Sequence, residues 1–174
     1  MALRRLLGSA LLVCALTITA SSGVRGAELP RSPFIGTWST FATPDPGGPP
    51  PFAGLLTLHP DGSLAETNAI LHPNSANPSL PFNASDGQGT WKQSNSRQMA
   101  FTFYKMLFAP DGAHAGFLRV RGSYRTTRQD PHHFVGDTQV DVILGPDPTG
   151  PVAQQLANVR VEGTRLRVLA ADRP

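Results

Sequence analysis

The feature that most constrains this chain is a pair of alternating segments between Gln98 and Tyr124, joined by a Pro110-Asp111-Gly112 turn. In the second segment, apolar residues and arginines take alternate positions. The apolar residues are Leu118, Val120 and Tyr124, and the arginines are Arg119, Arg121 and Arg125. Because the side chains of a strand point alternately to two faces, this pattern predicts a half-buried antiparallel strand. The first segment is apolar on both parities, which is typical of a strand between a core and a second surface.

Other segments of the chain repeat this strand-and-turn arrangement. Further strands are expected at Ile35–Thr43, Phe52–His59, Ser63–Leu71, Gly87–Gln93, His133–Leu144 and Asn158–Leu169. About eight strands at regular spacing, without a helical period after the N-terminal segment, indicate a barrel or a sandwich. The simple hairpin succession favours a single antiparallel up-and-down β-barrel, since closure leaves no free edge.

Long and short connections alternate, and in an up-and-down barrel alternate connections lie at the same end. The connections at 44–51, 72–86, 109–114 and 145–157 would share one end, and those at 60–62, 94–97 and 126–132 the other. The first group holds the long proline-rich loops and the second group holds tight turns. The pattern predicts an open mouth and a closed floor. The alternative is that the long loops are only tolerated insertions.

The N-terminal residues 1–26 have the pattern of a signal peptide. Arg4 and Arg5 precede an apolar run from Leu6 to Ala20, which is short for a membrane span, and small residues follow. We expect cleavage after Ala20 or Gly26, a mature domain at 27–174 without a membrane span, and a secreted or periplasmic location. The alternatives are a retained anchor helix or a lipoprotein acylated at Cys14, the single cysteine.

The positive charge of the chain belongs to this leader. Three of the 15 basic residues (Arg4, Arg5 and Arg25) lie before position 27 and no acidic residue does, so the remaining basic residues equal the 12 acidic ones in number. A neutral mature domain without a basic stripe argues against nucleic acid as a partner. The oligomeric state does not follow from the sequence.

Two short motifs give the chain a resemblance to a known family. Gly36-Thr37-Trp38 opens the first expected strand, and Gly163-Thr164-Arg165 lies in the last. With these motifs the chain resembles the calycins, or lipocalin-like barrels, and small secreted bacterial β-barrel proteins with the same two motifs. The resemblance implies that Trp38 closes the barrel floor and that a basic residue packs across it. Arg165 is the closest match, with Arg160 and Arg167 as alternatives.

The last strand requires a choice of register. Strict alternation from Val159 and Val161 would put both Arg165 and Arg167 inside the barrel, which is costly. We therefore expect a bulge at Gly163-Thr164 that returns Leu166 and Val168 to the interior. Arg165 alone would then cap the barrel over Trp38 by a cation–π contact.

The candidate ligand-binding residues are those expected in the interior. Aromatic residues for the lining or the floor are Trp38, Trp91, Phe101, Phe103 and Tyr104. Glu66 and Lys105 share strand parity with apolar residues, so they are the charged side chains expected to point inward. As an interior pair they could orient a ligand or act as acid and base. The alternative is that each reaches water from the end of its strand.

Other chemistry has little support. The five histidines (His59, His72, His114, His132 and His133) have no ligand spacing, so no metal site is expected, and no cofactor or nucleophile motif is present. Arginines at 119, 121 and 125 should form cross-strand ion pairs with Asp137 and Asp141 on a wet face. We therefore expect a barrel that binds a small, mostly apolar ligand. The alternatives are a barrel enzyme of cyclase or isomerase type, and a filled barrel that acts only through its surface loops.

Overall fold

Period-two patterning and tight turns organise this chain into one β-sheet. The computed structural model describes residues 32–68 and 82–167. Its strands are β1 (Gly36–Pro44), β2 (Phe52–Leu58), β3 (Ser63–Asn68), β4 (Asn83–Ala84), β5 (Gly87–Asn95), β6 (Gln98–Phe108), β7 (His114–Thr126), β8 (His133–Leu144) and β9 (Gln154–Arg165).

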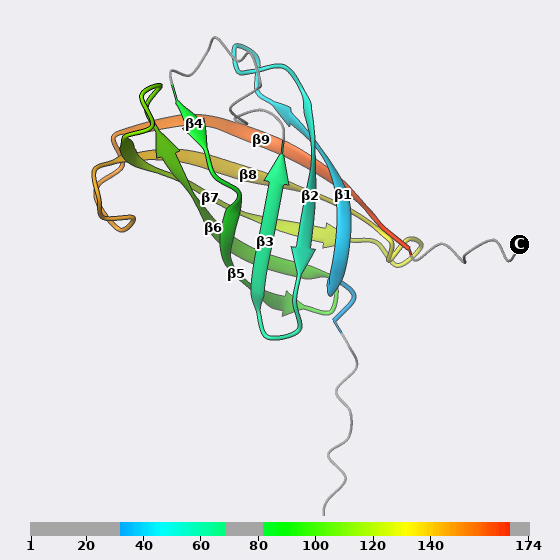
Figure 1. Cartoon of the computed structure of the whole chain (residues 1–174). Helices are drawn as coiled ribbons and strands as arrows, with labels where there is room; N and C mark the ends of the chain where they lie inside the picture. Colours follow the sequence, from blue (N-terminus) through cyan, green and yellow to red (C-terminus); the bar gives the residue numbers. More distant parts are fainter. Residues whose placement is uncertain (1–31, 69–81, 168–174) are drawn as a thin grey trace, which may run out of the picture.

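The sheet closes on itself. The strand order β6-β5-β3-β2-β1-β9-β8-β7 returns to β6 through the antiparallel β6–β7 pairing, and β4 adds a short second partner to the end of β6. Figure 1 shows β1, β2 and β3 as one wall, crossed obliquely by β7, β8 and β9. The predicted all-β, eight-stranded, up-and-down antiparallel barrel is confirmed for the described residues.

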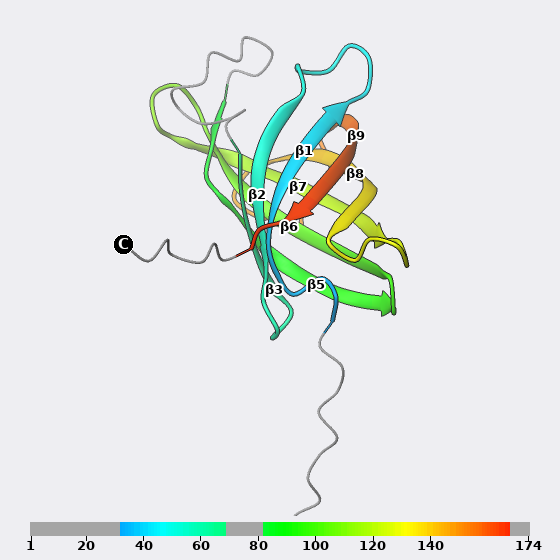
Figure 2. The same cartoon turned by 90° about the vertical axis from the view of Figure 1, so that its right-hand side faces the viewer.

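The two ends of the barrel differ as the hairpin order requires. The connections after β1, β6 and β8 lie at one end, the mouth, and those after β2, β5 and β7 lie at the other, the floor. In Figure 2 the β1–β2 loop is at the top and the β2–β3 turn is at the bottom. The segment 69–81, which includes most of the expected loop at 72–86 and His72, lies outside the described residues, as does the expected signal peptide.

The Pro-Asp-Gly turns are built as their sequence predicts. Gly62 has a φ of 85°, a value that glycine adopts without steric cost, and the Asp61 carboxylate accepts hydrogen bonds from the backbone and hydroxyl of Ser63. Gly112 has the same φ, and Asp111 accepts from the backbone of Ala113. These local bonds fix the register of the hairpins that the turns connect.

The interior is packed in two apolar clusters. The larger one extends from the floor to the walls of the cavity described below, and its fully buried side chains, which include Phe34, Trp38, Met99 and Phe134, fill the floor half. The smaller one lies near the mouth and consists of Leu107, Leu118 and Val142, against which residues such as Phe82 and Ala84 pack. Within the described residues, the structure contains no helix with the length and hydropathy needed to cross a membrane.

Two details of strand structure differ from the predictions. β9 begins at Gln154, earlier than expected, and its pairing with β1 and β8 is continuous through Gly163 and Thr164, so the predicted bulge is wrong. Strict alternation places Arg165 inside, and the strand ends there, which leaves Leu166 49% exposed and Arg167 exposed as well. The second difference is β4, which lies in the segment expected to be a loop.

Candidate functional site

The candidate site is a cavity of about 70 Å³ in the mouth half of the barrel. Its apolar walls are Ala42, Phe52, Leu56, Phe103, Val120, Val140, Val159 and Val161, and its polar wall residues are Thr40, Glu66, Asn68, Tyr124 and Thr138. The barrel is therefore filled near its floor and contains a small cavity above it. The cavity has room for roughly two water molecules at the volume each takes in the liquid, far less than a pocket for a drug-sized ligand.

An ion pair joins two strands that are not neighbours in the sheet. Glu66 lies on β3 and Lys105 on β6, and Lys105 Nζ is 2.8 Å from Glu66 Oε2, with the two side chains 11% and 3% exposed. β5 separates these strands, but Gly87 faces Glu66 in the β3–β5 register and has no side chain to obstruct the approach. A Cβ at Gly87 would come within 2.7 Å of the Phe103 ring and 3.1 Å of Glu66 Oε2.

The two carboxylate oxygens of Glu66 have different surroundings. Oε1 accepts a hydrogen bond of 2.6 Å from the Asn68 side-chain amide. Oε2 is close to the Lys105 ammonium, but the approach lies outside hydrogen-bond geometry, so this buried oxygen has no hydrogen-bond donor among the described residues. This oxygen is therefore compensated by the charge of Lys105 and not by a hydrogen bond.

Tyr124 completes the polar side of the cavity. Its ring lies on β7 between Phe134, stacked with a centroid distance of 4.4 Å, and Phe101, tilted at 4.5 Å. Burial, together with the negative charge of Glu66, raises the pKa of the Tyr124 phenol well above its ordinary value of 10.0. The hydroxyl is therefore a neutral hydrogen-bond donor at any physiological pH.

The floor is closed by Trp38 and Arg165. The Arg165 guanidinium carbon lies 4.5 Å from the centroid of the Trp38 ring, and its nitrogens donate to the carbonyls of Pro33 and Ile35. The Trp38 indole donates to the Phe34 carbonyl at 2.8 Å. Burial lowers the pKa of Arg165. These contacts tie the segment before β1 to the end of β9, which is a structural role at the opposite end from the cavity.

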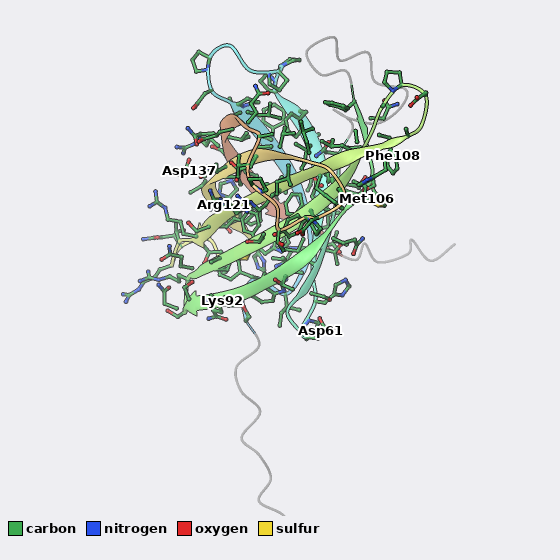
Figure 3. All side chains as sticks on the ribbon, turned by 90° about the vertical axis from the view of Figure 1, so that its left-hand side faces the viewer. Asp61, Lys92, Met106, Phe108, Arg121 and Asp137 are labelled. Atoms are coloured by element: carbon green, nitrogen blue, oxygen red, sulfur yellow. The ribbon has the colours of Figure 1, made fainter. Side chains whose placement is uncertain are left out.

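The predicted site residues divide into three groups. Phe103 and Glu66 line the cavity. Lys105 does not line it but forms the ion pair with Glu66. Trp38, Trp91 and Phe101 belong to the larger apolar cluster, as Phe103 does, but they do not line the cavity. Tyr104 lies on the outer face, so it cannot contact a ligand in the cavity. Figure 3 shows its parity mates Met106 and Phe108 on the outside of the barrel.

Sequence reasoning did not select the residues that give the cavity its polarity, other than Glu66. Tyr124, Thr40, Asn68 and Thr138 all line it. For Tyr124 the signal was present, because it shares the parity of Leu118 and Val120, which already indicated the inner face of β7. The same signal was present for Thr40, Asn68 and Thr138, which share the strand parity of Trp38, of Glu66 and of Val140, respectively.

The outer face of β7 and β8 carries charge pairs. Arg119 lies opposite Asp141 and donates to its carboxylate at 2.9 Å, and Arg121 approaches the same carboxylate at 3.4 Å. The expected cross-strand pairing is therefore present for Asp141. The expectation that Asp141 is wet is wrong, because the two arginines and Gln139, which donates to it at 3.0 Å, leave it 1% exposed. In Figure 3, Arg121 and Asp137 both lie on this outer face.

The described part of the chain has no group of three or more His, Cys, Asp or Glu side chains placed to hold a metal ion.

Comparison with known proteins gives only distant matches. No protein-family model matches it, and no curated protein matches it. The structure of a redesigned β-barrel, b11L5F_LGL, is 14% identical, with a TM-score of 0.45, and the match covers 80% of this chain and 98% of the other. The structure of EF1p2_mFAP2b bound to DFHBI is 13% identical, with a TM-score of 0.29, and the match covers 78% of this chain and 98% of the other.

Proposed function

We propose that this protein is an exported, lipocalin-like β-barrel that binds a small, mostly apolar molecule in its mouth half. The single observation that carries the proposal is the cavity of about 70 Å³, with valines and aromatic rings of the larger apolar cluster on its walls and a few polar groups among them. Apolar walls supply affinity and a small number of fixed polar groups supply orientation.

The polar groups favour binding over proton-transfer catalysis. An efficient general acid or base has a pKa near the working pH, whereas the pKa of Tyr124 is raised far above it. Glu66 lies beside the ammonium of Lys105 at 2.8 Å, so the pair supplies a fixed dipole in the wall. The barrel enzyme of cyclase or isomerase type remains the second candidate, because Glu66 does face the cavity.

Binding is tested by NMR titration of the chain from residue 27 with small molecules of about three non-hydrogen atoms. We expect saturable shifts that are confined to cavity-lining residues such as Val140 and Val159. The variant Ala42→Leu adds three carbon atoms inside the cavity and should abolish these shifts. Its matched control is Ala53→Leu, at an exposed position on β2, which should bind like the wild type.

Two results would refute the binding function. One is the absence of saturable shifts with every molecule tried, and the other is equal binding by the wild type and Ala42→Leu.

Export is tested separately. The intact mass of the protein recovered from the medium or periplasm should correspond to a chain that begins at residue 21 or 27. A chain that keeps Met1 and stays with the cells would contradict export.

A further inference from the structure

The two ends of the barrel carry opposite charge. Three exposed carboxylates and no basic residue lie in the described mouth connections, which follow β1, β6 and β8: Asp45, Asp111 and Asp147. Four exposed arginines lie in the floor connections, at the end of β7 and after β9: Arg97, Arg125, Arg128 and Arg167. The same described floor segments contain two carboxylates, Asp61 and Asp130. Lys92 adds a positive charge near this end, opposite the end at which Figure 3 shows Phe108. The barrel is therefore polarised along its axis, with a positive floor and a negative mouth.

Backbone hydrogen bonds hold the arginine-bearing segments of the floor together. The carbonyl of Arg97, in the turn between β5 and β6, accepts a hydrogen bond of 3.0 Å from the backbone of Thr126 at the end of β7. The backbone of Arg165 donates to the carbonyl of His132 at 2.9 Å, which ties the connection that contains Arg128 to the end of β9. Segments that are far apart in the sequence thus present their charges on one surface.

An apolar side chain and the N-terminal part of the chain meet the barrel at the same end. Leu166 directly follows Arg165 and is 49% exposed. The Arg165 guanidinium donates to the carbonyls of Pro33 and Ile35, so the chain enters the barrel at the floor. The apolar run Leu6–Ala20 precedes this entry in the sequence. A membrane that receives this run therefore lies on the floor side of the barrel.

We propose that the floor docks the protein on a membrane surface rich in anionic lipid, with the mouth turned toward solution. The lipid phosphates attract the guanidinium groups, and Leu166 contacts the boundary of the acyl chains. The carboxylates of the mouth are repelled from the same surface, so the charge distribution sets one orientation. The mouth of a second copy carries matching charge, but Leu166 and the entry of the chain at the floor favour lipid. This surface lies opposite the cavity and does not depend on the proposed ligand.

The test is cosedimentation of the chain from residue 27 with two kinds of vesicle. One kind is phosphatidylcholine alone, and the other is phosphatidylcholine mixed equally with the anionic lipid phosphatidylglycerol. At about 20 mM NaCl we expect binding to the anionic vesicles to be at least about tenfold stronger than to the neutral ones. At about 500 mM NaCl the difference should disappear, because salt screens the attraction. Equal binding to the two kinds of vesicle at low salt, or no binding to the anionic kind, would overturn the inference.

Two pairs of matched variants locate the docking surface. Arg128→Glu reverses a charge on the floor and should weaken binding to anionic vesicles about thirtyfold. Arg160→Glu makes the same change on the wall, where the side chain is 62% exposed, and should weaken it less than about threefold. Leu166→Ala should weaken binding about fivefold by removing the apolar contact. Leu55→Ala, at a position on the wall that is 44% exposed, should have no effect.

The remaining outcomes distinguish lipid from other occupants of the floor. If Arg160→Glu weakens binding as much as Arg128→Glu, the floor is not the docking surface. If Leu166→Ala binds as the wild type does, the attraction is to charge alone and the contact with lipid fails. If the protein associates with itself, Arg128→Glu abolishes this association and vesicles are not bound, the occupant is the mouth of a second copy and the inference fails. If Arg128→Glu does not fold, the comparison of lipids and salt on the wild-type protein decides.

Discussion

Lys105 places an ammonium group inside a barrel that is otherwise largely apolar, with 3% of its side chain exposed. Removing one member of a buried pair leaves the other charge without compensation, which costs about 3–5 kcal/mol. We therefore expect Lys105→Met to lower the free energy of unfolding by that amount in urea denaturation. The double variant Glu66→Leu/Lys105→Met removes both charges and should recover most of the loss.

The Arg160–Glu162 pair on β9 supplies the control for this prediction. Its charged groups are 3.7 Å apart and its side chains are 62% and 52% exposed. Glu162→Gln should change the stability by less than about 1 kcal/mol, as is usual for surface pairs. A double variant of the interior pair that is no more stable than Lys105→Met alone would show that packing, and not the unpaired charge, causes the loss.

Tyr124 predicts a dependence of stability on alkaline pH. Its pKa in the folded protein is raised above the ordinary value of 10.0 by burial and by the Glu66 carboxylate, so only the unfolded state ionises just above pH 10. Stability contributed by the neutral phenol is fully present below pH 10. Above pH 10, the free energy of unfolding falls by about 1.4 kcal/mol per pH unit from this residue. Urea unfolding between pH 9 and 11 should show this additional slope in the wild type and not in Tyr124→Phe. Equal slopes in the two proteins would contradict the assignment.

Among the strands, the packing of β9 depends on a close approach between its backbone at Gly163 and the ring of Phe134. Gly163 lies opposite Phe134 in the β8–β9 register, and a Cβ at this glycine would overlap the Phe134 ring. That ring is fully buried and held between Trp38 and Tyr124, so it has little room to move. We expect Gly163→Ala to destabilise the protein by about 1–3 kcal/mol, the usual cost of overpacking a core.

Thr164 is the neighbouring residue on the exposed face of the same strand. Thr164→Ala should cost less than half as much as Gly163→Ala in the same urea denaturation. Equal losses would mean that the strand backbone, and not the contact with Phe134, sets the sensitivity of this region.

The strands show which parts of the site followed from sequence. Alternation alone places Phe103 and Lys105 inward and predicts the direction of Glu66. It does not predict that these two charges meet, because the contact depends on Gly87 in the strand between them. The prediction that Tyr104 lies in the interior is wrong. It follows from the aromatic character of the residue, whereas the alternation of β6 places Tyr104 on the outer face. The predicted bulge in β9 assumed that Arg167 stays in the strand, whereas β9 ends at Arg165.

Burial of Asp141 could not be read from alternation either. Its position on β8 is outward, as predicted, but the side chains of Arg119, Arg121 and Gln139 cover it. Parity predicts the face of a strand on which a residue lies. The exposure of a residue on that face also depends on whether long side chains of its neighbours cover it. The structure shows this, and alternation does not.

At the scale of the whole molecule, the barrel was predictable because closure is the simplest way for a succession of hairpins to satisfy every strand edge. The division of the ends into floor and mouth followed from the order of the connections. The extent of filling did not, because an eight-stranded barrel is just wide enough for its side chains to fill it. Here the large side chains Trp38, Phe134 and Met99 fill the floor half, and valines and Ala42 leave a small cavity above them.

This uneven filling predicts uneven resistance to opening along the barrel axis. Local opening is easiest where few apolar contacts are lost, and the floor half contains the fully buried aromatic side chains of the larger cluster together with the Arg165–Trp38 contact. In native-state hydrogen exchange, the amides of β1, β8 and β9 near Trp38 and Phe134 should exchange last, at the rate of global unfolding. Amides near Ala42 and Val140, beside the cavity, should exchange earlier through local opening. Uniform protection from floor to mouth would mean that the cavity does not weaken its surroundings, and that the barrel opens only as a single cooperative unit.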